Sequence, residues 1–245
     1  KSADVESVKT MPGIRDAFHV VVYPEGAETQ WSDTGKIPEM VAIVGESTWQ
    51  CLQAKKALKA EWEAQDELES TAYHERELTA LLKKAPDTPA RRDGDPEAAF
   101  ARADKIIEST YSAPYLAHNC MEPMNFYANV TPEKAEMLGP TQTPEYLENT
   151  LASVLGLPED KIDVMMTRMG GGFGRRLYNT FAVEAAMISK KMGAPVKLVY
   201  TREDDMSQGT YRPSYMVHYK AGLDADGNLI AWHVRGAGTN SGLCI

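Results

Sequence analysis

The sequence predicts a mixed α/β fold of the α+β class, with βαβ units and a β-hairpin near its C-terminal end. Segments rich in β-branched and aromatic residues alternate with segments whose apolar residues recur at helical spacing. Residues 214–224 and 229–238 are two long strand-like segments, and the sequence Asp224-Ala225-Asp226-Gly227-Asn228 between them is typical of a hairpin turn. A length of 245 residues allows one large domain or two smaller ones.

Residues 1–63 predict a small β/α module. Strands are expected at residues 17–23 and 40–44, because these segments are short, apolar and bounded by turn-forming residues. A helix capped by Ser47 or Thr48 follows, and its apolar spacing predicts that it continues to Trp62.

Residues 64–96 predict a linker, because they are polar and contain several prolines. One short helix is expected inside the linker, at residues 75–83. The second domain would then occupy residues 97–245. At its start, Asp95 suits a helix cap and Pro96 suits the first position of a short helix.

The second domain is expected to continue with strands at residues 105–111 and 126–131. A longer helix follows, for which Thr143 is the natural cap and Pro144 the first helical residue. Gly156 ends this helix, since glycine readily adopts the left-handed conformation found at helix C-termini.

A strand at residues 161–167 is expected to run directly into a glycine-rich segment. A helix at residues 179–192 leaves that segment, and a strand at residues 196–200 comes next. Glycine backbone meeting a helix N-terminus is a physically sensible site for an anion or a dipole. Asp204 and Asp205, which follow the last strand, are expected to lie in a solvated turn.

The glycine-rich segment, residues 167–176, is called the glycine loop below. Four of its five residues from Gly170 to Gly174 are glycine, which lets the main chain approach a ligand closely and offer N–H donors. Phe173 argues against a plain linker, because its ring needs a packing partner. Arg175 stands where a dinucleotide fingerprint needs its last glycine, and the Gly-Lys-Ser/Thr of a phosphate loop is absent. Tight packing of a strand on a helix remains an alternative explanation for the glycines.

Composition narrows the class of partner and metal. A formal charge of −9, with acidic residues spread through the chain, argues against nucleic acid. Cys51, Cys120 and Cys244 lie far apart, which argues against a disulfide framework, a zinc ribbon or an iron–sulfur cluster in this chain. The histidines show no metal-ligand spacing, and no apolar run predicts a membrane span.

Because the chain begins at Lys1 without Met and stops at Ile245 within a strand-like pattern, we expect a fragment of a longer protein.

Several polar side chains have both a functional and a structural explanation. Gln142 is either a solvated glutamine before a helix or a neutral amide donor to an oxo or carbonyl oxygen. Glu122 is either a catalytic carboxylate or part of a rigid corner with the proline after it, and we favour the corner. His118 is either a core histidine or a histidine that supports the residues of the site. Arg175 and Arg176 are either surface charges or clamps for a phosphate-bearing cofactor.

Seven short motifs follow one another along the chain: His118-x-x-Met121-Glu122-Pro123, Thr141-Gln142-Thr143-Pro144, Leu155-Gly156-Leu157-Pro158, Arg168 to Arg176, Gly193-Ala194-Pro195-Val196, Thr201-Arg202-Glu203-Asp204-Asp205-Met206 and Tyr211-Arg212-Pro213. In this order they resemble the molybdopterin-binding subunits of the xanthine oxidase and aldehyde oxidoreductase family. Within that family the chain is most similar to the large (beta) subunits of isoquinoline 1-oxidoreductase and its relatives. Residues 11–62 resemble the end of the α/β hammerhead domain that precedes the molybdenum domain.

The resemblance implies an enzyme that hydroxylates an N-heterocyclic aromatic or oxidises an aldehyde, with water as the oxygen source. It implies a molybdenum-molybdopterin cofactor, which could be the cytosine dinucleotide form. It also implies a small partner subunit with [2Fe–2S] clusters. Gln142 and Phe173 match catalytic positions, because the glutamine amide and the loop backbone lie beside a molybdenum oxygen ligand in that family. The cofactor-binding positions by the same match are Gln142, Gly171, Gly172, Phe173, Gly174, Arg175 and Arg176.

Two departures from the family pattern bear on these expectations. The family's catalytic glutamate is expected outside this chain, so we expect the chain alone to be inactive. Arg175, Arg176 and Leu177 occupy the region where xanthine-oxidising members carry a glutamate, which argues against purine substrates. The alternative function is a non-catalytic binding or interaction module that retains the scaffold. The residues do not decide between a periplasmic and a cytoplasmic bacterial protein.

Overall fold

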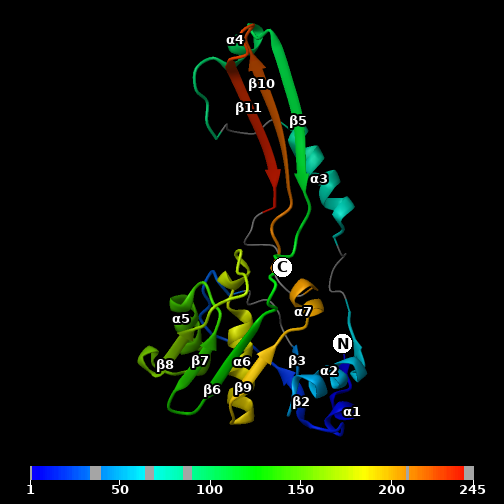
Figure 1. The fold of residues 1–245 in the computed structure, drawn as a ribbon, viewed down its shortest axis with the longest axis vertical. Helices are drawn as coiled ribbons and strands as arrows, with labels where there is room; N and C mark the ends of the chain where they lie inside the picture. Colours follow the sequence, from blue (N-terminus) through cyan, green and yellow to red (C-terminus); the bar gives the residue numbers. More distant parts are fainter. Residues whose placement is uncertain (1, 34–39, 64–68, 85–89, 208–209, 240–245) are drawn as a thin grey trace. The chain divides into compact units, whose positions relative to one another are not determined.

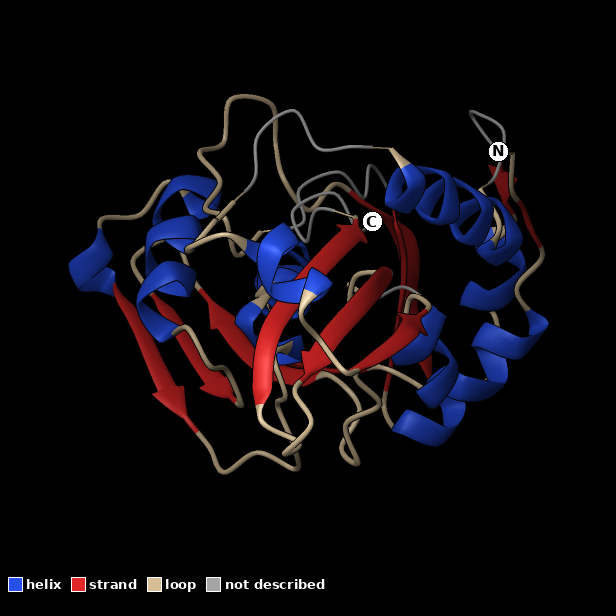
Figure 2. Ribbon diagram, turned by 90° about the horizontal axis from the view of Figure 1, so that it is seen from above, coloured by secondary structure: helices blue, strands red, loops and turns tan. Residues whose placement is uncertain are grey.

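The computed structural model describes residues 2–33, 40–63, 69–84, 90–207 and 210–239. Cys244, Ile245 and parts of the predicted linker lie outside these ranges. The chain forms two compact units, the first from residues 1–65 and 117–210 and the second from residues 66–116 and 211–244. Each unit combines helices with strands, which Figure 2 shows in blue and red, so the predicted mixed α/β class is confirmed.

The first part of unit 1 contains two small antiparallel strand pairs and two helices. Strand β2 pairs with β3, and the very short β1 pairs with β4. Ser47 caps α2 as predicted, and its hydroxyl accepts from the Gln50 N–H. The helix ends at Ala57 and not at Trp62, because the chain extends into β4 there and the Trp62 ring is exposed. The bounds are β1 Ser2–Ala3, α1 Val5–Lys9, β2 Ile14–Val20, β3 Met40–Gly45, α2 Thr48–Ala57 and β4 Ala60–Glu61.

The main sheet of unit 1 has four strands in the order β8-β7-β6-β9 (Figure 1). Strands β7 and β8 are parallel neighbours joined by α5, which makes a βαβ unit. Strands β8 and β9 lie at opposite edges, so the helix after the glycine loop, α6, connects strands that are not neighbours. The bounds are β6 Asn125–Val130, β7 Ala135–Gly139, α5 Pro144–Leu155, β8 Ile162–Met166, α6 Thr180–Met192, β9 Val196–Val199 and α7 Arg202–Ser207. Short 3₁₀ turns lie at Glu159–Lys161 and Arg175–Leu177.

One hydrophobic core joins this sheet to the N-terminal strands. Phe126 on β6 packs against Phe181 on α6, with ring centroids 5.8 Å apart, and both side chains are fully buried. Phe18, Val20 and Ala42 from β2 and β3 belong to the same core. The compact units therefore divide the chain differently from the predicted boundaries at residues 63 and 96, and those domain boundaries stay a prediction.

Unit 2 is built on a three-stranded antiparallel sheet in the order β11-β10-β5, whose strands run side by side in Figure 1. The predicted hairpin is confirmed, because β10 and β11 pair along their length across the turn at Asp224–Asn228. Helix α3 contacts β10 and β11, and α4 contacts β11. The bounds are α3 Thr71–Lys83, α4 Pro96–Ala101, β5 Lys105–Ala113, β10 Tyr215–Leu223 and β11 Leu229–Gly238.

A buried carboxyl group lies in the core of unit 1, on α6. The carboxylate oxygens of Glu184 lie 2.8 and 2.7 Å from the Tyr200 hydroxyl, and both residues are buried. Burial raises the pKa of Glu184 to about 8, while the Tyr200 hydroxyl and the positive charge of Arg175 act in the opposite direction. Because the folded-state pKa lies above the ordinary value of 4.5, folding favours the protonated carboxyl.

We expect the free energy of unfolding to fall as the pH rises from 4.5 to about 8, because the carboxyl of Glu184 is ionised in the unfolded chain and still protonated in the folded one across this window. The Glu184→Gln variant should show a flatter dependence, since a glutamine does not titrate. Urea denaturation of the intact protein at several pH values measures this. Tyr200→Phe removes the hydrogen bond that lowers the pKa of Glu184, so the decline should extend to higher pH. An unchanged slope in Glu184→Gln would contradict the assignment.

Candidate functional site

The glycine loop begins where β8 ends and turns back on itself before the 3₁₀ turn at Arg175–Leu177. Gly171, Phe173 and Gly174 all have positive φ angles, of 106°, 53° and 96°. A left-handed conformation costs a residue other than glycine on the order of 1–3 kcal/mol, so Phe173 is strained. Phe173 as a whole residue is 65% exposed. The surrounding contacts must therefore be strong enough to hold this conformation.

Glu122 holds the first glycine of the loop through two hydrogen bonds. Its Oε2 accepts from the Gly170 N–H at 2.7 Å, and its own N–H donates to the Gly170 carbonyl at 3.1 Å. The Asn125 amide donates to Oε1 at 2.9 Å. Burial would raise the pKa of Glu122, but the Gly170 and Asn125 donors and the charge of Arg176 lower it overall. Glu122 therefore belongs to a structural corner, as favoured above, and its ionised carboxylate anchors the loop there.

Arg176 lies beneath the loop with its side chain fully buried. Its Nε donates to the Gly171 carbonyl at 2.8 Å, and its Nη2 donates to the Glu122 carbonyl at 2.9 Å and to Glu122 Oε2 at 3.0 Å. Its Nη1 has no acceptor among the described residues. Arg176 is therefore not a surface charge. Its predicted contact with a cofactor stays a prediction.

Gln142 contacts the loop from the start of α5. Its Oε1 accepts from the Gly174 N–H at 3.2 Å, and its backbone N–H donates to the Arg176 carbonyl at 2.9 Å. An N–H group can only donate, so the atom that faces Gly174 must be the amide oxygen. The Nε2 amide of this exposed side chain then has no acceptor among the described residues. The Gly174 N–H, expected to face a ligand, is engaged by Gln142 instead.

Arg175 points into the protein beside a buried aspartate. Arg175 Nε lies 3.6 Å from Asp205 Oδ1, and the two side chains are 5% and 2% exposed. Arg202 Nη1 lies 3.2 Å from the other oxygen of Asp205 and also donates to Asn119. The expectation of a solvated turn is wrong for Asp205, because helix α7 places its carboxylate between two arginines. Only the charge run was visible in the sequence, and such runs are usually solvated.

A threonine–asparagine cluster holds the two residues that flank Gln142, and it was not predicted from the sequence. Thr141 Oγ1 donates to Asn179 Oδ1 at 2.8 Å, while the Asn179 amide donates to Thr143 Oγ1 at 3.0 Å. Thr143 occupies the N-cap position of α5 as predicted, but its hydroxyl donates to the Leu177 carbonyl and makes no cap bond. The polar Thr-Gln-Thr sequence before a helix was the one signal available.

Cys120 and His118 also lie against the loop. The Cys120 thiol is buried and donates to the Gly172 carbonyl at 3.4 Å, and burial raises its pKa. A Cβ atom on Gly174 would lie 3.4 Å from His118 Nε2, so the imidazole is a neighbour of the loop. The predicted site residues thus come together around residues 170–176, with Glu122 and Asp205 as additional members.

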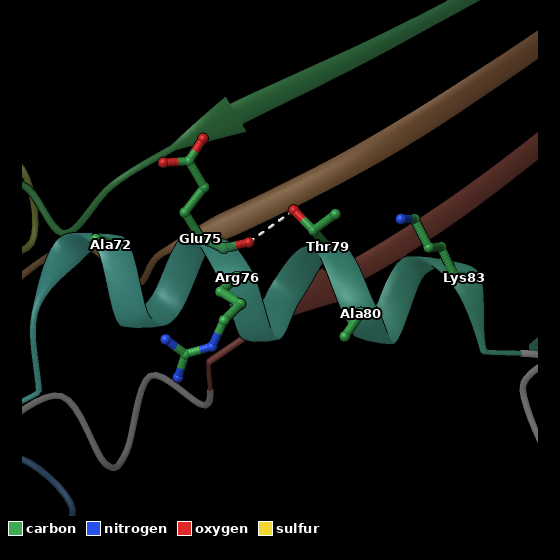
Figure 3. Close-up of a pocket in the computed structure, with 6 residues that line it drawn as sticks. All are labelled: Ala72, Glu75, Arg76, Thr79, Ala80 and Lys83. Atoms are coloured by element: carbon green, nitrogen blue, oxygen red, sulfur yellow. Dashed lines mark hydrogen bonds between the residues drawn. The ribbon is translucent and has the colours of Figure 1, made fainter.

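The described ranges contain no group of three or more histidine, cysteine, aspartate or glutamate residues placed to hold a metal ion. The same part of the chain has no helix with the length and apolar character needed to cross a membrane. A shallow hollow lies along α3 in unit 2, and every residue that lines it comes from this one helix (Figure 3). The hydrogen bond drawn there, from Thr79 Oγ1 to the Glu75 carbonyl, is internal to the helix. The groups that line this hollow differ from the backbone N–H donors of the glycine loop.

The geometry defines a domain that presents neutral N–H donors on a tight backbone, with cations held beneath them. A family model described as the molybdopterin cofactor-binding domain matches residues 81–242. The chain therefore belongs to the molybdopterin cofactor-binding domain family, which confirms the resemblance seen in the sequence.

Three comparisons illustrate the relationship. The chain is 29% identical over 200 residues to the membrane-bound aldehyde dehydrogenase (pyrroloquinoline-quinone) of Gluconacetobacter polyoxogenes, a match of 80% of this chain and 26% of that protein. It is 30% identical over 208 residues to isoquinoline 1-oxidoreductase subunit beta of Brevundimonas diminuta, again 80% of this chain and 26% of the relative. The aldehyde oxidoreductase structure of Desulfovibrio gigas matches with a TM-score of 0.69 at 19% identity, over 96% of this chain and 29% of that one. The chain thus spans about a quarter of the length of these two curated relatives.

We expect Gly172→Ala to displace the Gln142 side chain, because the new Cβ would lie 2.6 Å from Gln142 Oε1. The Gly174 N–H then loses its acceptor, and its hydrogen exchange should accelerate. Global stability should change little, since the end of a flexible side chain can move. Gly236→Ala is a matched control, because no atom lies within 4 Å of its Cβ position. Unchanged exchange at Gly174 would show that the loop absorbs the methyl group without moving Gln142.

Proposed function

We propose that this chain supplies one wall of the molybdenum-molybdopterin site of a molybdenum hydroxylase. The observation that carries the proposal is a set of three neutral donors in and beside the glycine loop. These are the N–H groups of Gly171 and Gly172, for which no described residue is an acceptor, and the Nε2 amide of the exposed Gln142 side chain. Oriented neutral donors of this kind suit a ligand whose oxygen gains negative charge during a reaction.

The residues fit such a cofactor because the glycine loop leaves its own backbone uncovered. A Cβ at position 170 or 172 would lie 2.6 Å from the Glu122 Cβ or from Gln142 Oε1, so glycine is required at both positions. Without side chains at residues 170–172, the loop does not cover the Gly171 and Gly172 N–H groups, and a ligand can approach them closely.

The roles of the residues follow from their contacts. When bound, a molybdenum pterin supplies the two-electron oxidation in which water provides the oxygen atom. Gln142 and the loop backbone would orient an oxygen ligand by hydrogen bonding, and the exposed Phe173 ring would limit the access of water to it. No carboxylate of the described site is free to act as a base, because Glu122 is held by Gly170, Asn125 and Arg176. A base from elsewhere in the intact protein is therefore part of the proposal.

The substrate class that we propose is an aldehyde or an electron-poor N-heterocycle, with electrons passed to a small subunit carrying [2Fe–2S] clusters. The names of the relatives support this class, since they include an aldehyde oxidoreductase subunit, a nicotinate dehydrogenase large molybdopterin subunit and isoquinoline 1-oxidoreductase subunit beta. The cytosine dinucleotide form of the pterin is part of the same proposal. The alternative is a binding module that retains the scaffold without catalysis.

Cofactor analysis of the intact protein, produced together with its iron–sulfur partner, tests the proposal directly. We expect molybdenum and a pterin in stoichiometric amounts by elemental analysis and pterin fluorescence. A folded complex without molybdenum would support the binding module. Pyrroloquinoline quinone in place of a pterin would contradict the proposal as well.

We expect Gln142→Ala in the intact enzyme to lower kcat by at least about tenfold, because loss of one oriented donor can reduce rates by two orders of magnitude or more. Thermal stability should change far less, since the Gln142 side chain is exposed and makes one hydrogen bond to the loop. Glu145→Ala, an exposed change in the first turn of the same helix, is the control. Unchanged turnover would remove Gln142 from the site.

A further inference from the structure

Three consecutive carbonyl groups of the glycine loop are held from the protein side. The Gly170 carbonyl accepts from the Glu122 N–H at 3.1 Å, and the Gly171 carbonyl accepts from Arg176 Nε at 2.8 Å. The Gly172 carbonyl accepts from the Arg175 N–H at 2.8 Å. None of the peptide bonds in the described residues is cis. The direction of each peptide unit in this segment is therefore fixed by a partner beneath it.

Fixing a carbonyl also fixes the next N–H group. In a trans peptide unit, the C=O of one residue and the N–H of the following residue point in opposite directions. The Gly171 N–H must therefore point away from the backbone of Glu122, and the Gly172 N–H must point away from Arg176. The two donors that the proposed function requires are aimed outward by contacts on the opposite side of the loop.

We propose that Arg176 is the positioning residue of this site, and that its guanidinium aims the Gly172 N–H at an oxygen-bearing ligand without touching that ligand. The inference rests on the proposed function and differs from the cofactor clamp expected from the sequence. The side chain of Arg176 is completely buried, and its Nε and Nη2 atoms bond to protein oxygens. Its carbonyl also accepts from the Gln142 N–H, so the third donor depends on the same residue.

The geometry requires an arginine and not merely a cation. The guanidinium reaches the Gly171 carbonyl with one nitrogen and both the carbonyl and the carboxylate of Glu122 with another. A lysine carries a single ammonium at the end of a flexible chain and cannot span these acceptors in a fixed fork. Glu122 completes the arrangement, because the oxygen that accepts from Arg176 also accepts from the Gly170 N–H.

Hydrogen exchange of the intact protein in its cofactor-free form tests the positioning role without any assay of activity. In Arg176→Lys, the Gly170 and Glu122 amides should exchange about tenfold faster or more, because the loss of charge-assisted hydrogen bonds frees the loop. Amides in α6 and β6 should keep their protection. Arg168→Lys is the matched control, since Arg168 is an exposed arginine of the same loop. Wild-type exchange at both amides in Arg176→Lys would overturn the proposal.

Turnover per bound molybdenum separates positioning from simple structural support. If Arg176 positions the donors, kcat per molybdenum should fall about tenfold in Arg176→Lys with little change in KM. An unchanged kcat per molybdenum would overturn the role and leave only a structural one. If the wild-type protein holds no molybdenum, the proposed function fails, while the exchange experiment still tests the loop.

Glu122→Gln keeps the proposal testable should Arg176→Lys fail to fold. The glutamine retains an oxygen for the Gly170 N–H but removes the charge that faces Arg176. Faster exchange of the Gly170 amide in this variant supports the clamp, and exchange equal to that of the wild type counts against it.

Discussion

The glycine loop depends on one buried cation, the guanidinium of Arg176. Taking a charge out of water is costly unless it is paired and hydrogen-bonded, and Arg176 meets both conditions through Glu122 and two carbonyl groups. Burial lowers the pKa of the guanidinium, whereas the Glu122 carboxylate raises it. The strained backbone at Phe173 persists because these contacts determine the loop on both sides of it.

The arrangement separates charge from the surface that meets a ligand. The cations lie beneath the loop, and the groups that face outward are neutral amides. The charged guanidinium of Arg176 donates to the Gly171 carbonyl and polarises the peptide unit between Gly171 and Gly172. The Gly172 N–H therefore becomes a stronger donor, because linked hydrogen bonds strengthen one another. Arg175 and Asp205 repeat the pattern more deeply, with Arg202 as the second cation. In the proposed function, such a site would stabilise developing negative charge without forming a salt bridge to its ligand.

The parts of this site that are local in sequence were predictable, and the parts that join distant segments were not. The glycine run, the strand before it and the helix after it follow from residue type and spacing, and Gln142 followed from the family motif. The pairing of Glu122 with Arg176 spans 54 residues, and no periodicity reports such a contact. Strand β7 was missed because Ala135–Gly139 contains no β-branched residue. Asp205 was misassigned because the three acidic residues from Glu203 look like a solvated run.

The long separations also affect how the protein folds. Arg176 bonds to Glu122 across 54 residues, and Gly174 bonds to Gln142 across 32. Each contact closes a long segment of chain, which costs conformational entropy. That cost is offset only when β6, α5 and α6 have packed together. From the cost of closing these segments, we expect the glycine loop to become ordered late in folding, after the scaffold has formed.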